Sequence, residues 1–274
     1  MALRTSDMCE LQSNLPLALL RCMRPMSSLV AGLMTSSVFW ARDGFSFRSM
    51  IAGLAMWMLT GFGFVINDIL DYRKDSEAGI DRPIARGLLT RKTALSFAAG
   101  LALAIFALSL WVGSGGGILA ATGLALILYT PSAQRLPLIK GVFVATLCMA
   151  PLYYGSVVCN AHYSWPLYLF MTAFVVGREA LMDADELRGD LRAGLITIAA
   201  ILGCARTKRI GIAIMALSLA GIGVVAGRWV AKAAAAAALV SLMTIFGWPR
   251  LHDAKRIELS RIPMLAAVLA IACG

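Results

Sequence analysis

The sequence predicts an all-α protein that crosses a membrane about nine times, and three observations lead to this fold class. Of the 274 residues, 59% are hydrophobic and 15% are charged, against roughly 45–50% apolar and about 25% charged in a soluble domain. Apolar runs recur along the whole chain, and positive charge gathers in alternate loops between them. Since a spanning helix needs about 20 apolar residues, no sizeable soluble domain fits beside the spans. We therefore expect residues 1–274 to form a single transmembrane domain.

Nine apolar runs bounded by charge, Gly or Pro are candidate spans. They cover about 17–40, 49–71, 93–112, 116–130, 141–159, 164–186, 210–227, 230–248 and 262–274. The runs at 116–130 and 262–274 are short for a straight span. Arg21 and Arg24 lie early in the first run, with no small-residue cleavage pattern before the next polar stretch. We therefore expect this run to be a retained helix and not a removable signal peptide.

The distribution of Lys and Arg predicts the orientation of these spans. The N-terminal start and the second, fourth, sixth and eighth loops hold 20 of the 25 Lys and Arg residues. Because cytoplasmic loops carry the excess of positive charge, we expect the N-terminus and residues 73–92 in the cytoplasm, and residues 159–163 and the C-terminus outside. The net charge of +10 then indicates a basic face against anionic lipid and no nucleic-acid partner.

Several classes of chemistry lack their usual residues. The six Cys show no close CxxC pairing, and the two histidines, His162 and His252, are far apart in the sequence. A disulfide framework, a zinc cluster and His-based catalysis are therefore not expected.

Ten of the 15 acidic residues lie in two short windows, which close the second and the sixth predicted span. Both windows are on the predicted cytoplasmic side. In the first window, Asn67, Asp71 and Asp75 repeat every four residues, and Asp68 lies within a narrow angle of Asp75 on a helical projection. At about 100° per residue, these four side chains share one helix face.

The second window has the same property. Glu179, Asp183, Glu186 and Asp190 follow the spacing i, i+4, i+7, i+11 and share one face, while Asp185 points elsewhere. Carboxylates buried at the centre of a span are unfavourable by about 2.5–3.5 kcal/mol each, and like charges at i, i+4 destabilise a helix further. We therefore expect positive charge to face both windows.

Two explanations of that positive charge remain open. Oxygen ligands on two facing helices suit Mg²⁺, which completes its shell with substrate phosphate, better than they suit zinc or copper. In the alternative, the windows are solvated helix ends whose acids pair with nearby basic side chains. Those side chains would be Arg73, Lys74, Arg178 and Arg188.

The residues in both windows resemble a known family. The stretch 67-NDILDYRKD-75, followed by 81-DRPIARG-87, resembles the NDxxDxxxD motif and the trailing RPIxxG of the UbiA superfamily of intramembrane prenyltransferases. The stretch 178-REALMDADELRGDLRAG-194 with Thr197 resembles the second aspartate motif of that superfamily. The resemblance implies nine helices around a central cavity, two Mg²⁺ ions, a polyprenyl diphosphate donor and an acceptor that receives the prenyl group.

The resemblance also assigns residues to these roles. The metal ligands it implies are Asn67, Asp68, Asp71 and Asp75 in the first motif and Asp183, Glu186 and Asp190 in the second. Glu186 stands where the superfamily pattern has Asp, and Met182 stands where many relatives have Lys, so the exact second-motif ligands stay open.

Further side chains should neutralise the diphosphate and stabilise the cation left after it departs. The candidates that face the diphosphate are Arg82, Arg86, Arg135, Lys140, Arg178 and, at the first helix, Arg24 or Arg21. An Arg inside a span is a site hypothesis by default, although Arg178 could instead pair with Glu179. Tyr129 resembles a tyrosine of the superfamily and is the candidate aromatic, and the resemblance suggests Asp71 as the base that removes the acceptor proton.

Two other functions are compatible with this pattern. A membrane terpene cyclase would use the same metal site without an external acceptor. A proton- or cation-coupled transporter fits less well, because the carboxylates lie at helix ends and not near the midplane. Resemblance alone suggests a small aromatic or glyceryl-type acceptor.

Overall fold

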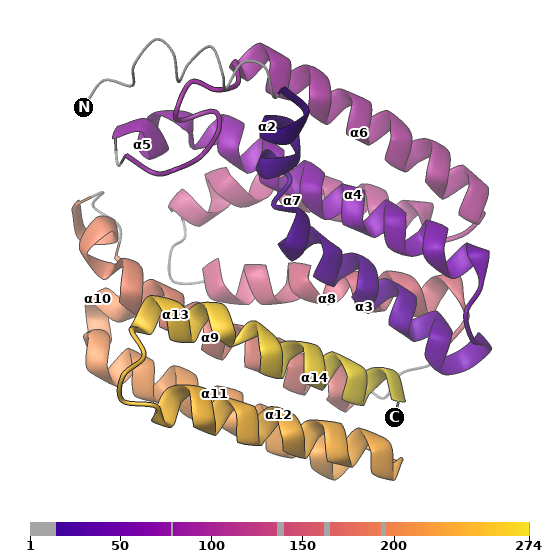
Figure 1. Cartoon of the computed structure of the whole chain (residues 1–274), viewed down its shortest axis with the longest axis vertical. Helices are drawn as coiled ribbons and strands as arrows, with labels where there is room; N and C mark the ends of the chain where they lie inside the picture. The colour runs from indigo at the N-terminus through magenta and orange to yellow at the C-terminus, as the bar shows by residue number, and fades with distance from the viewer. Residues whose placement is uncertain (1–14, 78, 136–139, 162–164, 193–195, 274) are drawn as a thin grey trace. The chain divides into compact units, whose positions relative to one another are not determined.

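The computed structural model describes residues 15–77, 79–135, 140–161, 165–192 and 196–273. Within these residues the secondary structure is helical, with turns between the helices and no strand (Figure 1). The chain divides into two compact units, one of Met1–Ser36 with Phe45–Thr130 and one of Ser37–Gly44 with Pro131–Gly274.

Long helices that pack along their length form the first unit. Its elements are α2 (Leu15–Cys22), α3 (Pro25–Asp43), α4 (Phe47–Leu70), α5 (Tyr72–Glu77), α6 (Arg91–Val112) and α7 (Gly116–Arg135), with α3 and α7 ending in the second unit. The α4 helix packs against α6. Glycine permits the closest approaches: a Cβ on Gly32 of α3 would lie 2.8 Å from the carbonyl oxygen of Gly53 on α4.

The first predicted span is broken, where the sequence predicted one continuous helix. The α2 and α3 helices meet at a 56° bend, and Arg24 between them has a φ of +49°. The residue before a proline is disfavoured in the helical conformation, and Pro25 follows directly. The left-handed backbone at Arg24 therefore ends one helix and starts the next.

Local capping explains where other helices begin and end. Ser46 caps α4 by accepting a hydrogen bond from the Ser49 N–H, and the Ser49 side chain completes a capping box. Thr90 caps α6 through the Thr93 N–H. Gly113, with a φ of +79°, ends α6 in the left-handed conformation that glycine adopts without strain.

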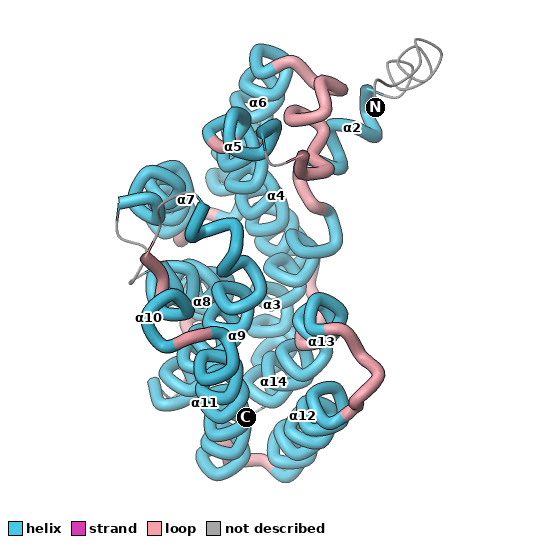
Figure 2. The backbone as a smooth tube through the Cα atoms, turned by 90° about the vertical axis from the view of Figure 1, so that its left-hand side faces the viewer, coloured by secondary structure: helices cyan, strands magenta, loops and turns pink. Residues whose placement is uncertain are grey.

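The second unit also consists of packed helices. Its elements are α8 (Lys140–Val158), α9 (Trp165–Arg192), α10 (Ile198–Leu202), α11 (Cys204–Val225), α12 (Trp229–Gly247), α13 (Asp253–Leu259) and α14 (Arg261–Cys273). The α9 helix packs on α8 and α11, and α12 packs on α11 and α14 (Figure 2). A Cβ on Gly177 of α9 would lie 2.6 Å from the Gly211 carbonyl oxygen of α11, so the two backbones are in direct contact.

Each of the nine predicted spans corresponds to a helix or to the bent α2–α3 pair, but the count of nine membrane crossings is not confirmed. Five helices of the described chain are long and apolar enough to cross a membrane, or six if the bent pair is one span. The apolar part of α7 is limited to Gly116–Tyr129, α9 carries the second acidic motif, and α14 has 13 residues. The chain is an integral membrane protein with several apolar spans.

Candidate functional site

The first acidic motif lies where α4 passes into α5. Asp71 is the C-cap of α4, so the helix is interrupted there and does not run on through the motif. The hydrogen bonds nevertheless keep the helical pattern: the Asp71 N–H donates to the Asn67 carbonyl at 2.8 Å, and the Asp75 N–H donates to the Asp71 carbonyl at 2.9 Å. The motif residues therefore remain on successive turns.

Asp68 is the most buried carboxylate of this motif, at 2% exposure. Its Oδ1 accepts hydrogen bonds from Arg24 Nη2 at 2.9 Å and from Arg82 Nη1 at 2.8 Å. The Arg24 guanidinium also lies 4.4 Å from the centre of the Phe64 ring, a cation–π arrangement. Two positive charges thus face one buried carboxylate.

Asp75 is buried next to the same arginine. Its Oδ2 lies 3.0 Å from Arg82 Nη1 without forming a hydrogen bond of acceptable geometry to any residue that the structure describes. Burial raises the pKa of the Asp75 carboxyl, against the opposing effect of Arg82. Because Arg82 Nη1 reaches both Asp68 and Asp75, the two carboxylates lie on the same side of the α4–α5 segment, as the spacing predicts.

The loop after α5 holds Arg82 in place. The Ile80 N–H donates to the Asp75 carbonyl at 2.9 Å, and the Arg82 N–H donates to the Ile80 carbonyl at 2.8 Å. Ile84 anchors the loop, because its side chain is buried. Arg86 instead forms a 2.9 Å ion pair with the exposed Asp81, so its contact is with the loop and not with Asp68 or Asp75.

The second acidic motif occupies the C-terminal half of α9. Lys140, at the start of α8, donates to Asp183 Oδ1 at 3.1 Å and lies 3.9 Å from Glu186 Oε2. Asp183 is buried, whereas the Glu186 side chain is 56% exposed. Asp185 is exposed and is not part of this contact.

Asp190 is also buried, at 6% exposure. Its Oδ2 has no hydrogen-bond partner among the described residues. A buried carboxylate oxygen without a donor is unfavourable, and a cation would relieve this. Asp75 Oδ2 also lacks a hydrogen-bond donor among the described residues, although the Arg82 guanidinium lies 3.0 Å from it. Each motif thus has a buried acid whose oxygen suits a metal ion, provided that Arg82 leaves Asp75.

Within its own motif Arg178 contacts Glu179 and Met182, and its described contacts do not include Asp183, Glu186 or Asp190. Its Nε donates to Ser260 Oγ at 3.2 Å, its Nη1 contacts the Met182 sulfur at 3.2 Å, and the same Nη1 lies 3.6 Å from Glu179 Oε1. Ser260 is fully buried between α13 and α14. These contacts match the alternative in which Arg178 is structural, and the sequence had no signal for Ser260, 82 residues away.

The remaining candidates have fewer described contacts. Tyr129 is half-buried on α7. Arg135 ends α7, but its side chain lies outside the described residues.

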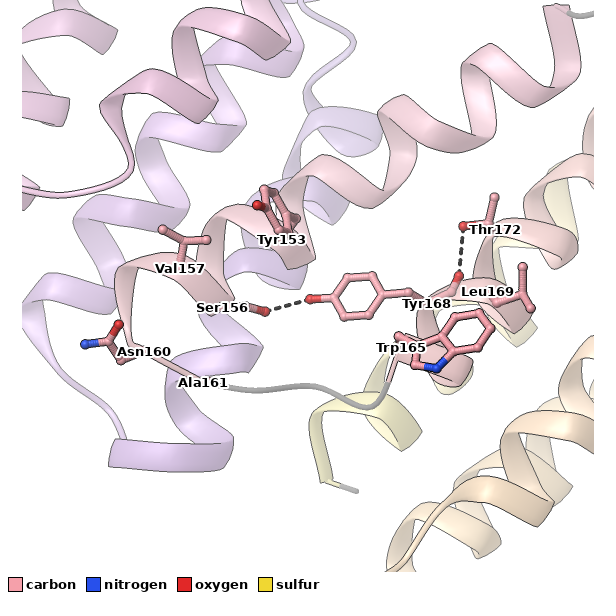
Figure 3. A pocket seen from close by; sticks show the side chains of 9 residues that line it. All are labelled: Tyr153, Ser156, Val157, Asn160, Ala161, Trp165, Tyr168, Leu169 and Thr172. Carbon is pink, nitrogen blue, oxygen red and sulfur yellow. Dashed lines mark hydrogen bonds between the residues drawn. The ribbon is translucent and has the colours of Figure 1, made fainter.

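A pocket of about 550 Å³ lies at the opposite end of α9, between the end of α8 and the start of α9 (Figure 3). The Ser156 and Tyr168 hydroxyls are 2.6 Å apart in its lining. Tyr168 precedes Asp183 by 15 helical residues, roughly 20 Å at 1.5 Å per residue. None of the predicted site residues lines this pocket.

Within the described residues, no three Asp, Glu, His or Cys side chains come close enough together to hold a metal ion. The first motif belongs to one compact unit and the second to the other. A metal site shared by the two motifs therefore remains a prediction.

The fold and these motifs define a class: a multi-pass helical membrane protein with two buried acidic motifs, each faced by Arg or Lys side chains. Residues 28–269 match the model of the UbiA prenyltransferase family. The chain belongs to this family, as the two motifs indicated.

The chain is also similar to named relatives and to solved structures. A digeranylgeranylglyceryl phosphate synthase of Methanoregula boonei is 29% identical over 232 residues, which cover 81% of this chain and 82% of the relative. The apo structure of a UbiA homologue from Aeropyrum pernix has a TM-score of 0.72 at 16% identity and covers 88% of this chain and 96% of that one. A UbiA homologue from Archaeoglobus fulgidus bound to GPP and Mg²⁺ has a TM-score of 0.69 at 16% identity, with 93% and 99% covered.

Proposed function

We propose that this protein transfers a prenyl group, within the membrane, from a polyprenyl diphosphate to an acceptor with the help of Mg²⁺. Membership of the family makes it a prenyltransferase. The observation that carries the proposal is the pair of buried acidic motifs, in each of which a buried carboxylate oxygen lacks a hydrogen-bond donor among the described residues.

The two motifs have the residues that a magnesium ion requires. Oxygen ligands and retained water suit Mg²⁺. Bound there, the ion would neutralise diphosphate oxygens and favour departure of the leaving group. The residues that would hold it are Asn67, Asp68, Asp71 and Asp75 in the first motif and Asp183, Glu186 and Asp190 in the second.

Basic side chains beside the motifs would bind the diphosphate. Arg82, Arg24 and Lys140 already contact motif carboxylates, so they are near enough to hold an anion that arrives there. Arg86 and Arg135 are further candidates on the same predicted side of the membrane. Arg178 has the weakest case, because it contacts Ser260 and Glu179.

In the reaction, the allylic C–O bond breaks and the diphosphate leaves with the electron pair. The acceptor hydroxyl then attacks the allylic carbon and gives its proton to a carboxylate, for which Asp71 is the candidate. Tyr129 would stabilise the cationic carbon through its ring. Exclusion of water from the membrane interior would protect that carbon from hydrolysis.

The acceptor is proposed to be a glyceryl phosphate that already carries one prenyl chain. The support is that the similar proteins from several organisms are named digeranylgeranylglyceryl phosphate synthase. A small aromatic molecule is the alternative acceptor.

The proposed function also depends on how the whole chain is organised into domains and oriented in the membrane. The two motifs lie in different compact units, so we propose that residues 1–274 act as a single domain in which both motifs serve one diphosphate. The loop charges support a cytoplasmic N-terminus, cytoplasmic motifs and an outside C-terminus.

Purified protein tests this function directly. It would be incubated with geranyl, farnesyl and geranylgeranyl diphosphates, with geranylgeranylglyceryl phosphate or an aromatic acid, and products would be identified by mass spectrometry. We expect prenylated glyceryl phosphate, loss of turnover after EDTA, and recovery with Mg²⁺ or Mn²⁺ but poor recovery with Ca²⁺, whose bonds are longer. Full activity after EDTA would contradict the metal assignment, and a hydrocarbon or terpene alcohol formed without acceptor would indicate a cyclase.

A further inference from the structure

One atom of Arg82 contacts both buried carboxylates of the first motif. Arg82 Nη1 lies 2.8 Å from Asp68 Oδ1 and 3.0 Å from Asp75 Oδ2. Arg24 Nη2 reaches the same Asp68 oxygen at 2.9 Å. The two guanidiniums and the two carboxylates sum to no net charge.

The two arginines are held differently. Arg24 lies in the break between two helices and stacks on the Phe64 ring. Arg82 lies on the loop between α5 and α6, whose anchor is the buried Ile84. The two side chains are similarly exposed, 25% for Arg82 and 34% for Arg24, but of the two only Arg24 has a ring contact among the described residues. Because no ring of the described residues holds the Arg82 guanidinium, Arg82 is the arginine whose side chain can leave the carboxylates without giving up a second contact.

A divalent cation and Arg82 compete for the same oxygens. Asp68 Oδ1 already accepts two charged hydrogen bonds, and a carboxylate oxygen has about two lone-pair positions. A metal ion bound there would also add two positive charges beside two guanidiniums. Charge repulsion and the occupied oxygen therefore oppose binding of the metal ion alone. A diphosphate that bound with the metal ion would supply negative charge to balance the added positive charge.

We propose that Arg82 is an exchangeable cation of this site: it occupies Asp68 and Asp75 until a metal ion takes the carboxylates, and then transfers to the diphosphate. The inference rests on the proposed function. It goes further in that Arg82 makes binding of the metal ion and of the diphosphate cooperative. Each ligand favours the movement of Arg82 away from Asp68 and Asp75, and this movement is what the other ligand needs.

The first test measures Mn²⁺ binding by electron paramagnetic resonance. Without diphosphate, Arg82→Gln should bind Mn²⁺ about tenfold more tightly than wild type, the scale of one lost charge-assisted competitor. Inorganic pyrophosphate should bind the Mn²⁺-loaded variant about tenfold more weakly than it binds Mn²⁺-loaded wild type, because the guanidinium that would bind the pyrophosphate is missing. A residue with a merely structural role would weaken both.

Two variants serve as controls. Arg82→Lys keeps the charge and should keep Mn²⁺ affinity near wild type. Arg73→Gln removes a charge from the exposed face of α5, and none of the described contacts of Asp68 or Asp75 involves Arg73, so its Mn²⁺ affinity should not change. Equal tightening by Arg73→Gln and Arg82→Gln would overturn the exchange in favour of a general charge effect.

A second measurement needs no variant, should Arg82→Gln fail to fold. Phenylglyoxal modification of the wild-type protein, mapped by mass spectrometry, should become faster at Arg82 when Mn²⁺ is added and slower again with pyrophosphate. Arg86, paired with Asp81, should not respond to Mn²⁺. If wild type binds Mn²⁺ and turns over but Arg82 does not respond, the exchange is wrong and the function stands; if wild type neither binds Mn²⁺ nor turns over, the function itself fails.

Discussion

Asp75 and Asp190 illustrate how the site depends on single atoms. Each is buried, and each has one carboxylate oxygen without a hydrogen-bond donor among the described residues. Their neighbours in the motifs, Asp68 and Asp183, are instead satisfied by Arg or Lys. Asp190 Oδ2 has no ion pair among the described residues either, whereas Asp75 Oδ2 still lies 3.0 Å from Arg82 Nη1, so a metal ion would have to displace Arg82 there.

The two motifs should behave as one unit in catalysis. Asp71→Asn and Asp190→Asn should each abolish turnover, because each removes a proposed ligand charge, while thermal unfolding in detergent stays close to wild type. Residues that act as a unit are non-additive, so the double variant should be scarcely worse than either single one. Product formation by mass spectrometry measures this.

Asp185→Asn is the matched control on the same helix, since Asp185 is exposed and contacts neither Lys140 nor the buried acids. Its effect should be mild. Equal sensitivity of Asp185 and Asp190 would mean that the functional face of α9 is assigned incorrectly, and a wild-type rate for Asp71→Asn would remove the enzyme mechanism.

At the scale of elements, α9 serves both packing and chemistry. Its Gly177 allows backbone contact with α11, and its C-terminal half carries the second motif. An ion pair joins α11 to the short α13: Lys208 Nζ on α11 lies 2.5 Å from Asp253 Oδ2 on α13. The hydrogen bond from Lys208 lowers the pKa of the Asp253 carboxyl.

The Lys208–Asp253 ion pair should make the stability of the protein depend on pH. Folding lowers the pKa of the Asp253 carboxyl. The contribution of the Lys208–Asp253 pair to the free energy of unfolding is therefore fully present above the unfolded pKa of about 3.9, and it is lost as the pH falls through the lower folded pKa. Asp253→Asn should therefore reduce the free energy of unfolding at pH 7 by no more than about 1 kcal/mol, since the pair is partly exposed. Thermal unfolding in detergent at neutral pH and at about pH 3 should show a difference that becomes smaller in acid.

Glu258→Gln, which breaks the exposed Lys255–Glu258 pair on the same α13, provides the comparison and should shift the melting temperature less. An Asp253→Asn effect of equal size at both pH values would rule out the ionised carboxylate as its source.

At the scale of the whole molecule, the loop charges predict which loops lie on the cytoplasmic side of the membrane, and this orientation can be measured. In protein from which the six native Cys have been removed, Glu77→Cys should react with a membrane-impermeant maleimide only after cell lysis. Arg228→Cys should react in intact cells, because it lies in a loop of the opposite predicted side. Both positions are exposed. The reverse labelling pattern would contradict the orientation deduced from charge.

The amino-acid sequence by itself determined the helical membrane class, the approximate helix positions and the two acidic faces. Helical periodicity is a local property, so spacing alone predicts that Asp68 and Asp75 share one side of the chain, even though Asp71 interrupts the helix between them. Only tertiary structure decided which cations meet them: Arg24 is 44 residues from Asp68, and Lys140 is 43 residues from Asp183. Packing likewise decided that Arg178 reaches Ser260, because ion pairs between distant segments depend on which helices lie together and not on any local pattern.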